Sequence, residues 1–240
     1  MYLMKITKSE YIDELVKKGN LFLTLASSFR DTSLYGYDKV DPHEGLMSRG
    51  YKLGVVLNGE RPYLFDNQKY TIVVNGTECI YSLKLVNEPW EDCIIRNPNS
   101  GKKEFIIGVP FLYGLLGEED LCEYSVLIIK NVFGFLNCVK TAITKSGLNG
   151  VMGKIEYDDH NFESSFSPFS DEYAMEAYYH KDRKFLSQSE FRILVQNSEK
   201  TNLVLNIGKE FFVPQNYFVV KFTPENIRVF RKAMLSNGNV

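Results

Sequence analysis

Gln188 and Glu190, which are separated by a single serine, are candidates for a catalytic pair. They follow a strongly charged segment, His180 to Lys184, and precede an apolar run, Phe191 to Val195, that is typical of a β-strand. If the strand begins at Glu190, alternation along an extended chain places Gln188 and Glu190 on one face. A carboxylate at the mouth of a loop, with an amide and Arg192 nearby, is a candidate for catalysis.

The same glutamate also has a structural interpretation. Glu190 could instead pair with Arg192 or Lys184 on a solvated edge strand, where charged side chains are common because they discourage edge-to-edge pairing. Without a buried ion pair, a Glu190→Gln change would then alter the free energy of unfolding by well under about 1 kcal/mol. The sequence leaves both interpretations open.

Composition limits the classes of protein that the chain could represent. It has 240 residues, 44% of them hydrophobic, with 17 Phe and 15 Tyr, which indicates a folded domain with an aromatic-rich core. The net charge is −2, so the chain does not have the positive charge that is typical of proteins that bind nucleic acid tightly.

The sequence also bears on metal sites and localisation. It has four dispersed cysteines and three histidines, from which we predict no metal site. The sequence shows neither a signal peptide nor a membrane span, so we expect a cytoplasmic protein with no membrane partner.

The elements that would position Glu190 predict an α+β fold in a single domain, 1–240. The expected sheet is mixed and mainly antiparallel, with a few flanking helices. Besides the strand after Glu190, strands are predicted at 2–6, 21–25, 51–57, 70–74, 77–86, 104–109, 124–130, 151–157, 203–207, 211–213 and 217–222. Helices are predicted at 7–19, 131–147 and 223–235.

Local signals support several of these boundaries. Thr7 and Glu10 have the spacing of a capping box, and Gly19 stands where a helix end favours glycine. Asn131 is expected to cap the second helix. Asn75-Gly76 predicts a hairpin between the strands on either side of it. The polar stretch 31–50 is either a binding loop or a long surface connection.

Several short segments carry a resemblance to a known group of proteins. They are an opening strand with aromatic and basic residues, the strand 20–25 before Phe29-Arg30, and the segments 41–45, 153–157, 188–192 and 205–208. On these segments the chain resembles a family of uncharacterised bacterial proteins, usually encoded near mobile or defence genes. The matching segments together span most of the chain.

The order of elements also resembles the ADP-ribosyltransferase superfamily. Its members carry a basic residue on a first strand, a Ser/Thr-rich second strand and a late glutamate, and Gln188-Ser189-Glu190 is similar to the Gln-x-Glu form of that last motif. The resemblance implies a split sheet of that type, NAD as cofactor, and Glu190 and Gln188 as catalytic residues. The residues it places at the NAD site are Tyr2, Lys5, Thr24, Ser27, Ser28, Phe29 and Tyr113. The first strand offers Tyr2 and Lys5 where the superfamily has Arg or His.

The implied chemistry suits these residue types. Breaking the bond between nicotinamide and ribose develops positive charge on the ribose, which a fixed carboxylate such as Glu190 stabilises. Gln188 would hold the acceptor, and an aromatic ring such as Phe29 or Tyr113 would stack on nicotinamide. A glycine-rich phosphate fingerprint is absent from the sequence, which argues against a Rossmann-type cofactor site.

Two functions of different classes follow from the sequence. The first is an ADP-ribosyltransferase that modifies a macromolecular acceptor, protein or nucleic acid, as a toxin or phage-defence effector. An antitoxin or inhibitor protein is then a further expected partner. The second is a non-catalytic α+β module that binds a partner protein or a nucleotide signal through the 31–50 stretch and the late strands.

Overall fold

The computed structural model describes most of the regular elements of the chain. The described residues are 1–30, 46–50, 53–55, 63–65, 69–73, 77–86, 94–96, 103–105, 123–158, 176 and 178–221. Tyr113, most of the 31–50 stretch, and the predicted helix 223–235 lie outside these residues. The described part forms an α+β fold with a mainly antiparallel sheet. None of the helices among the described residues has the length and hydrophobicity of a membrane-spanning segment.

The chain divides into two compact units. The first comprises Met1–Phe22, Leu83–Ala142 and Val204–Val240, and the second comprises Leu23–Ser82 and Ile143–Leu203. Strand β7 (Glu78–Val86) contributes residues to both units.

The first unit is built around three antiparallel strands and the end of β7. β1 (Tyr2–Lys8) pairs with β10 (Tyr124–Ile129) on one side and with β7 on the other, and β10 pairs with β16 (Tyr217–Lys221). The five residues from Ser125 to Ile129 are all buried, because β10 has a hydrogen-bonded neighbour on each side and is covered on both faces.

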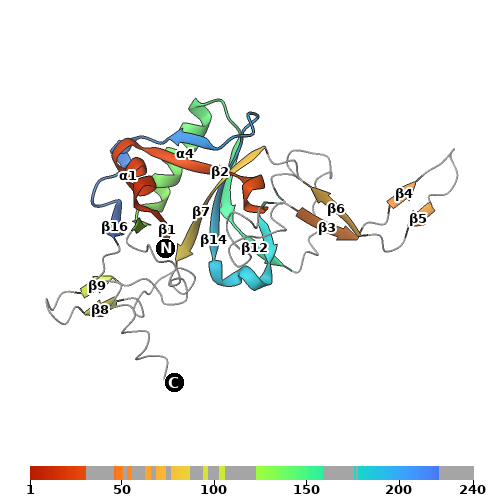
Figure 1. The fold of residues 1–240 in the computed structure, drawn as a ribbon, viewed down its shortest axis with the longest axis horizontal. Helices are drawn as coiled ribbons and strands as arrows, with labels where there is room; N and C mark the ends of the chain where they lie inside the picture. The colour runs from red at the N-terminus through yellow and green to blue at the C-terminus, as the bar shows by residue number, and fades with distance from the viewer. Residues whose placement is uncertain are drawn as a thin grey trace, which may run out of the picture. The chain divides into compact units, whose positions relative to one another are not determined.

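Helix α1 (Ser9–Lys18) follows β1 directly, as Figure 1 shows. It buries Ile12 and Leu15, which lie three residues apart on one face of the helix. The predicted capping box is wrong: β1 continues through Thr7 and Lys8, which pair with Ser125 and Tyr124, and no side chain caps the helix. Thr7 and Lys8, which the local pattern placed at the start of the helix, are therefore the last two residues of β1.

The end of α1 confirms its predicted glycine stop. Gly19 has a φ of 77°, in the left-handed region, and its N–H bonds back to the carbonyl of Leu15. Its backbone is also packed tightly, since a β-carbon at Gly19 would lie 2.6 Å from the carbonyl carbon of Gly208.

Gly19→Ala should therefore lower the free energy of unfolding by more than about 2 kcal/mol, because it adds a steric clash to the cost of a left-handed alanine. Gly147→Ala is the matched control: its φ is 67°, and a β-carbon there would meet nothing within 4 Å. The control should cost only about 1 kcal/mol. Urea denaturation of both variants measures the difference, and equal losses would contradict the expected clash.

Helix α4 (Val132–Lys145) confirms a second local prediction. The side-chain oxygen of Asn131 accepts a hydrogen bond of 3.0 Å from the N–H of Gly134, as an N-cap residue does. Phe135 and Val139, four residues apart on one face of the helix, are fully buried, and Phe135 packs against Phe211 with ring centroids 5.7 Å apart.

The strand predicted at 211–213 is not formed. Residues Lys209–Phe211 form the short 3-10 helix η5, and the N–H of Phe212 bonds to the carbonyl of Lys209 at 3.0 Å. Gly208, with a φ of 85°, turns the chain into this helix after β15 (Leu203–Asn206). The apolar residues of this segment predicted an extended backbone, but local hydrogen bonds form a short helix instead.

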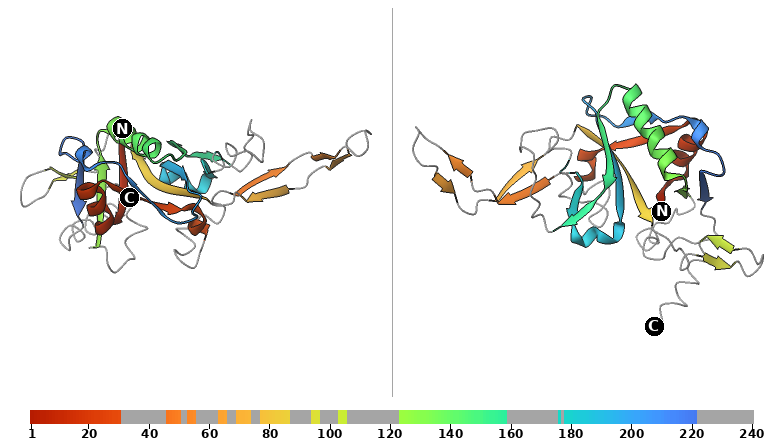
Figure 2. Two further views of the ribbon diagram at one scale, coloured as in Figure 1. Left: turned by 90° about the horizontal axis from the view of Figure 1, so that it is seen from above. Right: turned by 180° about the vertical axis from the view of Figure 1, so that it is seen from behind.

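The second unit has a central strand, β14 (Glu190–Gln196), with neighbours on both sides. β14 lies between β11 (Gly150–Lys154) and β7, and Figure 2 shows β11 and β14 running side by side. Six consecutive residues of β14, from Glu190 to Val195, are buried. Strand β2 (Asn20–Leu25) also pairs with β7 in this unit, through Thr24 and Leu25.

A small parallel pair completes the described core of this unit. β12 (Glu156–Asp158) pairs with β13 (His180–Asp182), which leads into the 3-10 helix η4 (Arg183–Gln188). A continuous strand was predicted over 151–157, but it is interrupted at Ile155, whose N–H bonds to the carbonyl of Glu190.

Three further two-stranded ladders occur among the described residues. They pair β3 (Leu46–Gly50) with β6 (Lys69–Val73), β4 (Leu53–Val55) with β5 (Tyr63–Phe65), and β8 (Ile94–Arg96) with β9 (Lys103–Phe105). The turn predicted at Asn75-Gly76 lies outside the described residues. The hairpin expected across it is wrong, because the described β6 forms a two-stranded ladder with β3 while β7 pairs with β1, β2 and β14. β3 lies in the 31–50 stretch, which was predicted to be a loop or a surface connection, and β8 lies where no strand was predicted.

Candidate functional site

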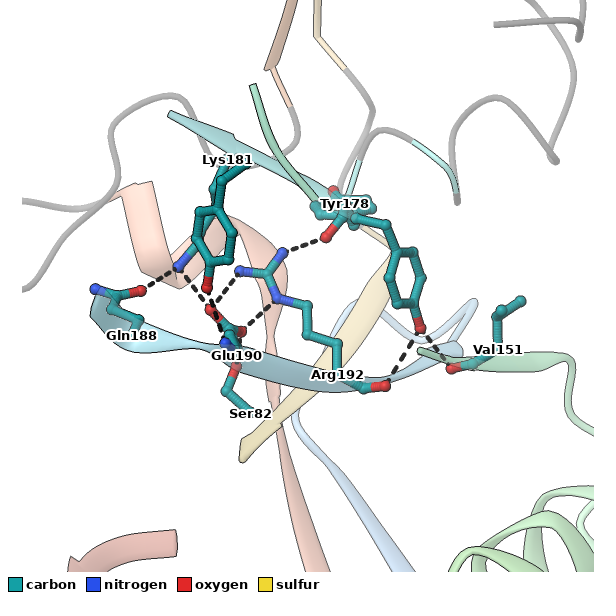
Figure 3. Close-up of polar contacts among 9 residues, drawn as sticks. Ser82, Val151, Tyr178, Lys181, Gln188, Glu190 and Arg192 are labelled. Carbon is teal, nitrogen blue, oxygen red and sulfur yellow. Dashed lines mark hydrogen bonds and ion pairs between the residues drawn. The ribbon is translucent and has the colours of Figure 1, made fainter. Parts of the chain in front are cut away.

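The carboxylate of Glu190 is the centre of a buried polar cluster in the second unit (Figure 3). Its Oε1 atom accepts hydrogen bonds of 2.5 Å from the Ser82 hydroxyl and 2.5 Å from Nε of Arg192. Its Oε2 atom lies 2.8 Å from Nζ of Lys181. Glu190 is only 6% exposed, so these contacts replace water around the carboxylate.

The position of β14 explains this burial. β7 and β11 flank β14, so it is not an edge strand, and Glu190 and Arg192 lie two residues apart on one face of it. The segment that carries Tyr178 and Lys181 contacts both side chains. The structural interpretation of the sequence was therefore right about the partner Arg192 and wrong about a solvated edge strand. Lys184, its other suggested partner, instead places Nζ 4.9 Å from the centre of the Phe185 ring.

Arg192 joins Glu190 to the segment that precedes β13. The side chain is fully buried, and its Nη2 atom lies 3.4 Å from Oε2 of Glu190 while Nε bonds to Oε1. Its Nη1 atom donates a hydrogen bond to the backbone carbonyl of Tyr178. The planar guanidinium thus contacts both carboxylate oxygens and a carbonyl at once, as such a fork is suited to do.

Lys181 brings the two predicted catalytic residues together. Its ammonium donates to the side-chain oxygen of Gln188 at 3.0 Å and pairs with Glu190 at 2.8 Å. Gln188 is not on the same strand face as Glu190, because it ends η4 and Ser189 turns the chain with a φ of 44°. The predicted pair does meet, but through a lysine rather than through strand alternation.

Two tyrosine hydroxyls form hydrogen bonds with the backbone of Glu190 and Arg192. The Tyr157 hydroxyl accepts a hydrogen bond of 2.8 Å from the N–H of Glu190, and the Tyr179 hydroxyl donates to the carbonyl of Val151 at 2.8 Å. Burial raises the pKa of both hydroxyls, so both stay protonated at neutral pH. Nearby, Nδ1 of His180 lies 2.6 Å from a carboxylate oxygen of Asp158.

The charges around Glu190 decide its ionisation. Burial by itself would raise the pKa of this carboxyl, but the positive charges of Arg192 and Lys181, with their hydrogen bonds, outweigh burial and hold the pKa well below the ordinary value of 4.5. Glu190 is therefore an anion in the folded protein at neutral pH.

The depressed pKa predicts how stability depends on pH. Because folding favours the anion, Glu190 contributes its full stabilisation above the pKa of the unfolded chain and loses it as the pH falls through and below that value. The free energy of unfolding should fall by up to about 1.4 kcal/mol per pH unit from this group below about pH 4.5. Urea denaturation between about pH 6 and pH 3 should show a steeper fall for the wild type than for Glu190→Gln. Parallel curves would contradict a Glu190 pKa that differs between the two states.

The remaining sequence-predicted site residues are distributed over both units. In the second unit, Thr24 of β2 pairs with Ile80 of β7. Ser27, Ser28 and Phe29 lie in the 3-10 helix η1 (Ala26–Arg30), where the Ser28 hydroxyl donates a hydrogen bond to the carbonyl of Leu25. In the first unit, Tyr2 and Lys5 lie on β1, opposite Val86 and Leu127 respectively. Tyr113 lies outside the described residues.

The groups that contact Glu190 were mostly missed by sequence reasoning. The serine at the carboxylate is Ser82, which is 108 residues from Glu190, rather than Thr24, Ser27 or Ser28. Lys181 lies in the charged segment His180 to Lys184, but its position relative to Glu190 in the sequence did not distinguish it from Lys184 as the ion-pair partner. Ser82 could not be recognised from the sequence, because it reaches Glu190 only through the pairing of β7 with β14 in the sheet.

Comparisons with known proteins do not assign this site, since no protein-family model, curated protein or solved structure matches the chain. The geometry of the Glu190 cluster is therefore the basis for a functional proposal.

Proposed function

We propose that the chain is an ADP-ribosyltransferase that uses NAD to modify a macromolecular acceptor. The observation that carries this proposal is the convergence of Gln188 and Glu190 on the single ammonium group of Lys181. The two residues that the Gln-x-Glu resemblance names thus share one polar cluster, and the Ser82 hydroxyl also contacts the carboxylate.

The free energy needed to bury these charges and to strain the backbone beside them supports a function for the cluster other than stabilising the fold. Buried ion pairs are weak stabilisers, because desolvation of the charges offsets much of their attraction. Ser189, between the two candidate residues, adopts a left-handed φ of 44° that is unfavourable for a residue other than glycine. Strained backbone and strongly shifted pKa values concentrate at functional sites.

The proposed reaction transfers ADP-ribose from NAD to a nucleophile. The bond between the ribose C1′ atom and the nicotinamide nitrogen breaks, and its electron pair leaves with nicotinamide. The acceptor nucleophile bonds to C1′ and releases its proton. Glu190 would stabilise the positive charge that develops on the ribose, and Gln188 would orient the acceptor by hydrogen bonding.

NAD should stabilise the folded protein, because a ligand that binds only the folded state raises its apparent stability by mass action. At a hundredfold excess over the dissociation constant the gain is about 2.7 kcal/mol, which corresponds to a rise of a few degrees in Tm. A thermal shift assay with NAD measures this gain. Nicotinamide release and ADP-ribose adducts on cell-lysate components, detected by mass spectrometry, test the transfer itself. NADP serves as a control for specificity of the nucleotide.

A second candidate is the non-catalytic α+β module that binds a partner protein or a nucleotide signal. One observation favours it: both carboxylate oxygens of Glu190 are engaged by Ser82, Arg192 and Lys181, as expected of a structural ion-pair centre. Absence of any NAD-induced shift and of nicotinamide release from the folded protein would select this candidate over the enzyme.

A further inference from the structure

The Glu190 carboxylate poses a specific problem for the proposed chemistry. A carboxylate that stabilises positive charge on a ribose must face that ribose, whereas Oε2 of Glu190 faces the Lys181 ammonium at 2.8 Å. Two opposite charges at this distance, removed from water, interact strongly, and the lysine reduces the attraction available to a second cation.

We propose that Lys181 is an autoinhibitory residue, whose ammonium holds Gln188 and Glu190 in a resting arrangement and must withdraw before Glu190 can face substrate. This inference rests on the proposed function for its consequence in catalysis. The contact itself, and control of access to the carboxylate, can be tested without that function.

The cluster indicates why Lys181 is the partner that withdraws. Arg192 belongs to the same strand as Glu190 and is also anchored to the carbonyl of Tyr178. Lys181 comes instead from β13, whose ladder with β12 is separate from the ladder that contains β14. A lysine side chain is flexible and carries a point charge, so it can leave one acceptor without movement of the backbone.

Lys181 also has an alternative position close at hand. Its Nζ atom already lies 5.4 Å from the centre of the Phe185 ring, on the face of which an ammonium group is attracted. The backbone hydrogen bonds that join the two ladders, from Ile155 to the carbonyl of Glu190 and from Glu190 to the Tyr157 hydroxyl, do not involve the lysine side chain. Withdrawal of Lys181 therefore leaves β14 and Arg192 in place.

The first test compares Lys181→Ala with Lys184→Ala in the full chain. Lys184 is a matched control, because it contacts the same Phe185 ring but is exposed on η4 and does not contact Glu190. With water as the acceptor, we expect Lys181→Ala to raise kcat for NAD hydrolysis at least tenfold, and Lys184→Ala to leave it within twofold. Lys181→Met keeps the volume of the side chain without its charge, and it replaces Lys181→Ala if circular dichroism shows that the alanine variant fails to fold. An unchanged or lower kcat in the folded variant would overturn the proposal.

The second test measures access to the carboxylate by labelling with a water-soluble carbodiimide and an amine, followed by mass spectrometry of the Glu190 peptide. Glu190 should be labelled at least fivefold faster in the folded Lys181 variant than in the wild type or in Lys184→Ala. If NAD is neither bound nor cleaved by any variant, the proposed function fails, and labelling alone decides the autoinhibitory contact. Equal labelling in all three proteins would then overturn it.

Discussion

Glu190→Gln is expected to reduce ADP-ribose transfer by a factor of about 100 or more, because the carboxylate that stabilises the ribose cation is replaced by a neutral amide. The same change should lower the free energy of unfolding by about 3–5 kcal/mol, since it leaves two buried cations without their anion. The partners left behind are Arg192, with a side chain 2% exposed, and Lys181, with a side chain 9% exposed. On a solvated edge strand, the same change would have altered the free energy of unfolding by well under about 1 kcal/mol.

Two measurements keep these effects apart. Chemical denaturation gives the free energy of unfolding, and transfer is assayed at a temperature where circular dichroism shows the variant to be folded. Glu156→Gln is the matched control, because Glu156 is an exposed glutamate of β12 in the same unit. It should change the free energy of unfolding by less than about 0.5 kcal/mol. A folded Glu190→Gln protein with wild-type transfer would rule out Glu190 as the catalytic carboxylate.

Arg192→Met should cost about 3–5 kcal/mol of unfolding free energy, although methionine fills most of the same volume. The guanidinium is fully buried, and its loss removes the bonds to both oxygens of Glu190 and to the carbonyl of Tyr178. Urea denaturation at neutral pH measures the loss. Arg183→Met, at an exposed position on η4, should change the free energy by less than about 0.5 kcal/mol.

A double-mutant cycle tests whether Glu190 and Arg192 act together. Because each single change strands a charged partner, the double variant Glu190→Gln/Arg192→Met should cost less than the two single losses added, by about 1–3 kcal/mol. Strict additivity would mean that the two side chains contribute independently, contrary to their contact at 2.5 Å.

Elements whose signals lie within a few neighbouring residues could be predicted from the sequence alone. Gly19 ends α1 and Asn131 caps α4 as expected, because each acts on backbone groups that are at most four residues away. The apolar run Phe191 to Val195 likewise predicted the strand β14, in which these residues are buried.

Local signals failed where a distant strand competed for the same residues. The capping box at Thr7 lost to the ladder with β10, in which Thr7 pairs with Ser125. The hairpin signal at Asn75-Gly76 did not predict that β6 would pair with β3. In both cases the local preference is worth about 1 kcal/mol, and a ladder of several backbone hydrogen bonds and buried side chains exceeds it.

The candidate site shows the same division. Adjacency along the chain was sufficient to single out Gln188, Glu190 and Arg192, but not to decide whether Glu190 faced water. That depends on distant contacts: β7 and β11 make β14 an interior strand, and Lys181 of β13 and Ser82 of β7 contact the carboxylate, which is buried and therefore needs its ion pairs. Ser82 joined the site for the same reason, since a sheet brings together side chains that are 108 residues apart and a sequence pattern records only neighbours.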